Sequence, residues 1–220
     1  ATRPDLSDRK KRAVLEVFPD PEDAYLADEK AFADMELSAE ELASLLDKNL
    51  TQAEKILEIC EEKDIHICVL SDEEYPFRLK NIDDPPLVLY YRGQLPDFDK
   101  APAIAAVGTR KASAYGLTAA RQLGFQLVRC GAILVSGAAD GIDGAAMEGA
   151  LKAGGIVVGV LGNGVDVHYP AESRYLYEDV AAAGALISEY PPGTEPAGRH
   201  FPARNRIISG LCLATLVVEA

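Results

Sequence analysis

The chain has 220 residues, 48% of them hydrophobic, and a formal net charge of −13. These values allow one large or two small globular domains, and no run of about twenty apolar residues predicts a membrane span. Residues 1–10 lack the apolar core of a secretion signal. The four cysteines have no CxxC spacing and the three histidines are isolated, which predicts buried thiols in a reducing cytoplasm and no metal site.

The negative charge is concentrated in the N-terminal part of the chain. Residues 1–100 hold 13 Lys/Arg against 25 Asp/Glu, whereas residues 101–220 hold 9 against 10. The C-terminal part can therefore present a basic surface, so the acidic composition of the whole chain does not exclude a polyanionic ligand.

Residues 1–63 have the pattern of short helices with acidic exposed faces. Ser38 is followed three residues later by Glu41, which is a capping-box pattern, and apolar residues then recur at helical spacing. A second helix is expected from about Thr51. We expect residues 1–63 to form a small acidic helical domain that serves in packing or partner contact.

Residues 64–220 are expected to form a second, larger domain. Its first part, residues 65–93, contains two β-rich runs, 65–70 and 87–93, that predict a two-strand extension of the main sheet. From residue 101 onward, short apolar runs alternate with helix-like segments. The runs lie at residues 104–107, 133–135, 156–161, 186–187 and 213–218. This alternation predicts an α/β fold with a Rossmann-like, doubly wound, mostly parallel sheet. Ligands of such sheets bind beyond the carboxyl ends of the strands.

The loop after the first of these strands combines a glycine with basic residues. Gly108 and Thr109 are followed by Arg110 and Lys111, and a helix is expected to begin near Ser113. Free backbone N–H groups and the positive helix dipole favour an anion at such a helix start. Gly-Thr also occurs in loops of this kind simply to form the turn.

Two further loops contain glycines that allow close backbone approach to a ligand. In the first, Ser136 and Gly137 are candidates for phosphate contact, and Asp143 is expected to cap the following helix. In the second, Gly162 and Asn163 are also candidates for phosphate contact, and they belong to a GxG sequence that lacks the third glycine of a dinucleotide-binding motif. No Walker A sequence is present, and no cofactor is predicted.

The most basic stretch is 199–206, which holds three arginines and His200 with no acidic residue between Glu195 and Glu219. It is expected to be a further ligand-facing loop, just before the last strand. Guanidinium groups suit phosphate and an aromatic face suits a base. We expect direct ligand contact from Phe201 and Arg204. Asn205 is a further candidate for ligand contact, with packing or loop fixing as the alternative. Arg206 is a candidate for phosphate contact, or it supports the site while bound to Glu189 or Glu219. Glu189 is a candidate for orienting Arg110 or Arg204. The alternative is a solvated helix end or a structural ion-pair cluster.

These motifs together resemble the DprA/Smf family of DNA-processing proteins over roughly residues 65–220. The residues that carry the resemblance are Tyr75-Pro76 with Leu79, Asp84-Pro85-Pro86, 89–93, 107–110, Ser113 with Tyr115-Gly116, 134–137, 141–143, 160–162, Tyr169-Pro170, 188–190 and 201–210.

The resemblance implies a non-enzymatic protein that binds single-stranded DNA, with contacts centred on Arg110 and Phe201. It further implies protection of incoming DNA during natural transformation, loading of RecA onto strands coated by SSB protein, and a homodimer. Residues 1–63 fall where many members carry a SAM-like domain. Met147 and Ser173 depart from the residues that members often have. Members usually continue beyond the last strand, so a C-terminal part of the fold, with its dimer contacts, is expected to be missing.

Two other functions remain open at this stage. A similar Rossmann-like rim occurs in LOG-like nucleotide phosphoribohydrolases, where an Arg and a Glu act on a nucleoside monophosphate. Glu189 or Asp140 with Arg110 is the corresponding pair here, although the PGGxGT loop of those enzymes is absent. The third possibility is a nucleotide-sensing module that makes no contact with DNA.

Overall fold

The computed structural model describes residues 2–3, 5–169 and 174–220. The chain divides into two compact units, Ala1–Glu58 and Ile59–Ala220. The division falls inside helix α4 (Thr51–Glu62) and therefore a few residues before the predicted boundary. The SAM-like character of the first unit remains a prediction. No helix within the described residues is long and apolar enough to cross a membrane.

The first unit consists of short helices around a small core of Leu6, Val14, Ala24 and Phe32. Its elements are α1 (Asp8–Val17), α2 (Pro21–Leu26), the 3₁₀ helix η1 (Glu29–Phe32) and α3 (Ala39–Leu46). Side chains cap the start of each of these helices, because Ser and Asp oxygens accept the free N–H groups of a first turn. At α3 the predicted capping box of Ser38 and Glu41 is confirmed.

The second unit is built on a seven-stranded sheet with the order β1-β2-β6-β5-β4-β3-β7 across its described residues. The strands are β1 (His66–Val69), β2 (Val88–Gly93), β3 (Ala103–Val107), β4 (Ile133–Ser136), β5 (Val157–Val160), β6 (Ala185–Ser188) and β7 (Ala214–Val217). Strands β3 to β7 are parallel, and β1 and β2 add an antiparallel extension next to β6. The predicted α/β class and the strand extension are confirmed.

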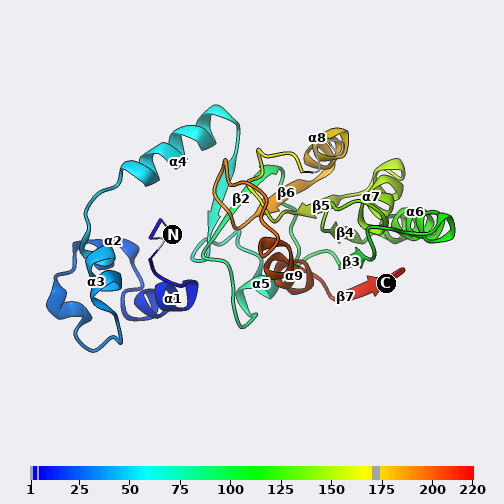
Figure 1. Cartoon of the computed structure of the whole chain (residues 1–220). Helices are drawn as coiled ribbons and strands as arrows, with labels where there is room; N and C mark the ends of the chain where they lie inside the picture. The colour runs from blue at the N-terminus through cyan, green and yellow to red at the C-terminus, as the bar shows by residue number, and fades with distance from the viewer. Residues whose placement is uncertain (1, 4, 170–173) are drawn as a thin grey trace. The chain divides into compact units, whose positions relative to one another are not determined.

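Helices cover both faces of this sheet. The crossovers α6 (Ala114–Arg129), α7 (Ile142–Lys152) and α8 (Arg174–Ala183) each lead to the adjacent strand in one direction. Helix α9 (His200–Leu211) instead returns across the sheet to β7, beside β3. Right-handed crossovers then require α9 to lie on the opposite face. Figure 1 shows α9, together with α5 (Phe77–Lys80), on that side. The strand order therefore reverses between β3 and β7, which is where doubly wound sheets bind ligands.

The central strands are buried on both faces, so they read as short continuous apolar runs. Every residue of β4, β5 and β6 is buried, including Ser136 and Ser188. The outer edge strand β7 is mostly exposed. The short apolar runs in the sequence therefore predicted the positions of the central strands correctly, although apolar and polar residues do not alternate along them.

The cysteines differ in exposure more than predicted. Cys60 and Cys68 are buried, but Cys130 at the end of α6 is exposed and Cys212 is half-buried. Burial raises the pKa of the Cys68 thiol to about 11 and that of Cys212 to about 12. The prediction of four buried thiols is thus wrong for Cys130, which follows the last turn of an amphipathic helix on its solvent side.

We expect Cys130 to react first with a thiol reagent. Only the thiolate is nucleophilic, and the raised pKa values and burial of Cys68 and Cys212 suppress it at neutral pH. Titration of the folded protein with Ellman's reagent at pH 8 should show one fast thiol, with the others reacting about a hundredfold more slowly. Loss of the fast phase in Cys130→Ser identifies it; a fast phase that survives this substitution contradicts the assignment.

Candidate nucleic-acid interface

The candidate site lies at the carboxyl ends of the parallel strands, at the switch point between β3 and β7. Three loops meet there: 108–113 after β3, 137–141 after β4 and 161–169 after β5, and the start of α9 faces them. The predicted convergence of these segments on one edge of the sheet is observed.

Two adjoining hollows mark this edge, and they share Arg110, Ala139 and Phe201. The first, which we call the rim pocket, has a volume of about 60 Å³. It is lined by Arg110, Gly137, Ala138, Ala139, Asp140, Leu161, Gly162, Asn163, Tyr169, Tyr177 and Phe201. The second, the α9 groove, has a volume of about 510 Å³. It is lined by Val107, Gly108, Arg110, Ala139, Asp143, Phe201, Pro202, Arg204, Asn205, Arg206, Ile208, Ser209 and Thr215. Arg110 and Phe201 therefore border both the small rim pocket and the larger α9 groove.

Arg110 and Phe201 lie against each other although about ninety residues separate them in sequence. The guanidinium carbon of Arg110 is 5.1 Å from the centre of the Phe201 ring, a cation–π contact. Arg110 is exposed and makes no ion pair with any residue the structure describes. Phe201 also packs against Tyr169, with the ring centres 5.6 Å apart and an interplanar angle of 29°. A charge available to a phosphate thus stands beside stacked aromatic rings.

The loop that carries Arg110 is fixed by its backbone. The Thr109 N–H donates to the Glu219 carbonyl at 2.8 Å, and the Thr109 carbonyl accepts the Ile142 N–H at 3.2 Å. A Cβ on Gly141 would lie 2.3 Å from the Thr109 carbonyl oxygen, so only glycine allows this approach, with φ at +80°. Lys111 is exposed next to Arg110 but lines neither hollow.

Glu219 has a role that the sequence interpretation missed. Its carboxylate accepts hydrogen bonds from the Ser113 N–H at 3.0 Å and from the Ser113 hydroxyl at 2.8 Å. Helix α6 begins next to Ser113, as predicted, and Ser113 caps it by accepting the Gly116 N–H. The residue suggested as a partner of Arg206 therefore holds the start of α6 instead.

Arg204 does not face the ligand, which corrects the expectation of direct contact. Only 4% of its surface is exposed, and its guanidinium donates to the carbonyls of Gly137 at 2.9 Å and of Val160. Burial lowers the pKa of Arg204, and the nearby Asp143 carboxylate acts against this. Arg204 thus cross-links the ends of β4 and β5 beneath the rim.

Asp143 is also internal and is not the helix cap that was predicted. The N-cap of α7 is Gly141. Asp143 is 6% exposed, and its carboxylate accepts the N–H groups of Gly108 and Gly137, each at 3.1 Å. Burial raises its pKa, and these hydrogen bonds and Arg204 oppose the rise. Because it bonds two loops at once, Asp143 sets the spacing between the 108–113 and 137–141 segments.

Two other predicted contacts are also used inside the protein. Ser136 is fully buried and donates its hydroxyl to the Ala106 carbonyl at 2.6 Å, so it cannot reach a phosphate. Asn163 is 1% exposed, and its amide donates to the carbonyls of Gly164 and Val167. Gly162 has a different use, because a Cβ there would lie 2.9 Å from the Phe201 ring. The absence of a side chain at Gly162 lets that ring pack on the loop.

Arg206 is held by Glu189, one of the two partners suggested for it. Its two terminal nitrogens lie 2.7 and 2.6 Å from the Glu189 carboxylate oxygens, a bidentate pair. Its Nε also approaches the Asp84 carboxylate at 3.1 Å. The terminal nitrogens of Arg206 are therefore not free to bind a phosphate. Because Glu189 is bound to Arg206, it orients neither Arg110 nor Arg204. Asn205 is exposed in the α9 groove.

Tyr169 and Tyr177 were not predicted as site residues, yet both line the rim pocket. The Tyr177 hydroxyl donates to the Tyr169 carbonyl at 2.7 Å, which ties α8 to the loop after β5. Ala138 lies in the same pocket with φ at +51°, an unusual conformation for a residue with a side chain. Tyr169 follows the glycine-rich loop at residues 162–164, and this position was the sequence signal that could have identified it as a site residue.

The two departures from the family pattern have different outcomes. Met147 is fully buried in α7 and lines neither hollow. Pro170 and Ser173 lie outside the described residues.

Comparison with known proteins identifies the family of this chain. Residues 66–220 match the family model described as DNA recombination-mediator protein A. The chain belongs to the DprA/Smf family. It is 38% identical to the DNA processing protein DprA of Bacillus subtilis over 84% of this chain and 62% of that protein. It is 41% identical to protein Smf of Synechocystis over 76% of this chain and 42% of that protein. The chain thus spans about two-fifths to three-fifths of the length of these relatives.

Two solved DprA structures resemble the fold. The X-ray structure of DprA from Streptococcus pneumoniae superposes with a TM-score of 0.82 at 32% identity, covering 98% of this chain and 74% of that one. DprA from Helicobacter pylori, solved in a study of its single-stranded DNA binding mode, gives a TM-score of 0.63 at 28% identity, covering 70% and 68%. Membership of the DprA/Smf family, as the sequence motifs indicated, is confirmed.

Proposed function

We propose that this chain binds single-stranded DNA, without catalysing a reaction, along the rim pocket and the α9 groove. Arg110 and Lys111 contact phosphates, and a base stacks against the aromatic residues Phe201 and Tyr169. The observation that carries the proposal is the exposed Arg110 guanidinium lying over Phe201, which itself stacks with Tyr169. Electrostatic contact with the backbone combined with stacking is how proteins bind single strands without reading their sequence.

The wider role is proposed by analogy with the family. The protein protects incoming single strands during natural transformation, helps to load RecA onto strands coated by SSB protein, and acts as a homodimer in the cytoplasm. Support comes from membership of the recombination-mediator family. The cysteines, which are all free thiols, fit a reducing compartment.

One feature favours the nucleotide phosphoribohydrolase as a second candidate. Asp140 lines the rim pocket together with Arg110, so an acid and an arginine do meet at one small pocket. The other carboxylate proposed for that reaction, Glu189, is bound to Arg206. The pocket's small volume of about 60 Å³ also suits one planar group better than a whole nucleotide.

A titration separates these functions. We expect a labelled thymidine 20-mer to bind, and its association constant to fall steeply between about 50 and 200 mM salt, because each phosphate contact releases counterions with a slope of about −0.7. AMP should bind far more weakly and should release no adenine. Binding that does not change with salt, equal affinity for AMP, or release of free base would each contradict the proposal.

A further inference from the structure

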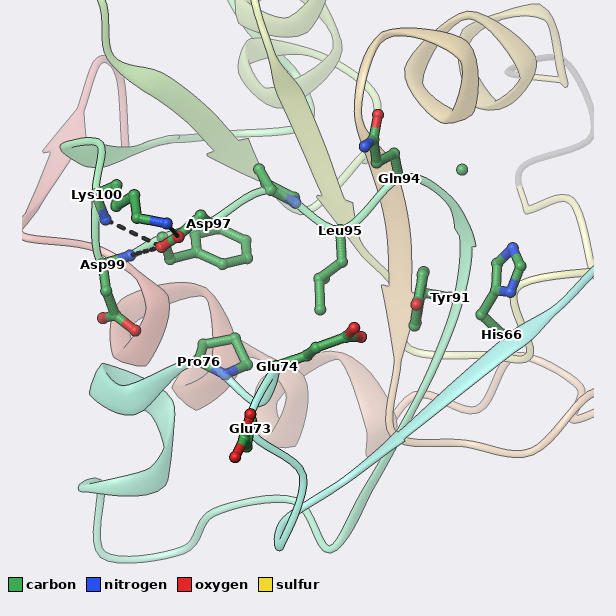
Figure 2. A pocket seen from close by; sticks show the side chains of 13 residues that line it. His66, Glu73, Glu74, Pro76, Tyr91, Gln94, Leu95, Asp97, Asp99 and Lys100 are labelled. Atoms are coloured by element: carbon green, nitrogen blue, oxygen red, sulfur yellow. Dashed lines mark hydrogen bonds and ion pairs between the residues drawn. The ribbon is translucent and has the colours of Figure 1, made fainter.

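A second groove lies in the larger unit, away from the rim. It has a volume of about 660 Å³ and is formed by the β1–β2 extension, the turn at 73–76 and the loop at 94–100. Figure 2 shows it with Tyr91 and His66 on one side and Asp97, Asp99 and Lys100 on the other. It shares no lining residue with the rim pocket or the α9 groove.

The groove is negatively charged, and only part of that charge is neutralised within the protein. Asp97 pairs with Lys100 at 2.7 Å, and Asp99 accepts the Phe77 N–H at 3.1 Å. Glu73 and Glu74 make no ion pair or hydrogen bond with any residue the structure describes. The two glutamates differ in direction: Glu74 extends beneath Leu95 towards Tyr91, whereas Glu73 points away (Figure 2). Glu74 is therefore the carboxylate presented to a ligand.

An aromatic wall stands opposite this carboxylate. The His66 and Tyr91 rings lie 5.1 Å apart with an interplanar angle of 32°, because the two residues are register partners on β1 and β2. Burial raises the pKa of the Tyr91 hydroxyl, and the negative charge of Glu74 is the next largest cause. The apolar residues Leu95, Pro96 and Pro76 complete the lining.

We infer that this groove binds an arginine side chain of a basic segment from a partner protein. Charge complementarity selects a cation, because the lining residues include four carboxylates and one lysine, and Glu74 faces the groove without an ion-pair partner among the described residues. The Glu74 carboxylate matches a guanidinium fork, the ring of Tyr91 suits its planar face, and Leu95 and Pro76 suit its aliphatic stem. A nucleic acid is disfavoured by the same charges.

The position of the groove allows both ligands to bind at once. It lies beside Gly93 of β2, which pairs with Ala185, the first residue of β6. The proposed DNA site lies at the opposite, carboxyl ends of the parallel strands. A basic partner held here would therefore not compete with a DNA strand for Arg110.

The test uses the full chain and a fluorescein-labelled heptapeptide with two arginines, beside the same peptide with citrulline, which has nearly the same shape and no charge. We expect the arginine peptide to bind at low salt and the citrulline peptide to bind at least fivefold more weakly. Glu74→Gln should weaken the arginine peptide about fivefold, and Glu73→Gln less than about twofold, although both variants lose one exposed negative charge.

Three results would overturn the inference: no binding of the arginine peptide, equal binding of the citrulline peptide, or equal losses in the two glutamate variants, which would indicate attraction to net charge alone. Asp140→Asn, which removes a carboxylate that lines the rim pocket, should leave the peptide affinity unchanged, and a loss in that variant would place the peptide at the rim. This test reads peptide binding directly, so its failure is distinct from a failure of DNA binding.

Discussion

Replacing Arg204 by alanine is expected to lower the free energy of unfolding by about 3–5 kcal/mol. Arg204 is 4% exposed, and its guanidinium donates to the carbonyls of Gly137 and Val160. Its loss leaves these carbonyls without their donor and removes the positive charge that offsets the buried Asp143 carboxylate. Urea denaturation, followed by circular dichroism, measures the change.

Arg110→Ala is the control for this prediction. The same side chain is removed, but Arg110 is exposed, so its loss should change stability by no more than about 0.5 kcal/mol. If the two variants unfold at the same urea concentration as the wild type, Arg204 is not the internal cross-link described above.

Arg110→Ala is in turn expected to weaken binding of single-stranded DNA about tenfold or more at low salt. A charge-assisted contact to phosphate contributes about 1.5–3 kcal/mol, and no other residue of the rim pocket is an arginine or a lysine. The slope of log K against log salt should become shallower by about 0.7, the value for one contact to a single strand. Fluorescence anisotropy at several salt concentrations gives both quantities.

Arg129→Ala makes the matched comparison, because it removes the same charge from the end of α6, at the opposite end of the crossover from Ser113. We expect its affinity and its salt slope to stay within about twofold of the wild type. Equal losses in the two arginine variants would mean that long-range charge, rather than contact at the rim, determines binding.

Much of the fold could be predicted because its signals are local. Strands buried on both faces appear as short apolar runs, and a serine followed three residues later by glutamate forms a cap wherever a helix begins, as at Ser38. Likewise, the meeting of Gly108 and Gly137 at one edge follows from the rule that parallel strands end together.

The ligand contact predicted for Arg204 in the basic stretch 199–206 is wrong, because the charge of a residue does not show in which direction its side chain points. Residues 200–211 form a helix, and Arg204, Ile207, Ile208 and Leu211 share its buried face at helical spacing. That spacing was visible in the sequence and would have placed Arg204 inside. The sequence suggested Glu189 or Glu219 as the partner of Arg206 but could not decide between them, and the bonds of Asp143 to two loops could not be predicted. These contacts join segments brought together only by the completed sheet.

The most direct test of the central claim is to find where bound DNA lies. A thymidine 20-mer with 5-bromouracil is bound to the protein, irradiated, digested and analysed by mass spectrometry. The account predicts cross-links to Phe201 or Tyr169, because the rings of both residues border the rim pocket. The cross-link at residue 201 should disappear in Phe201→Leu. Cross-links confined to the first unit, Ala1–Glu58, or to the outer faces of α6 and α7 would contradict this account.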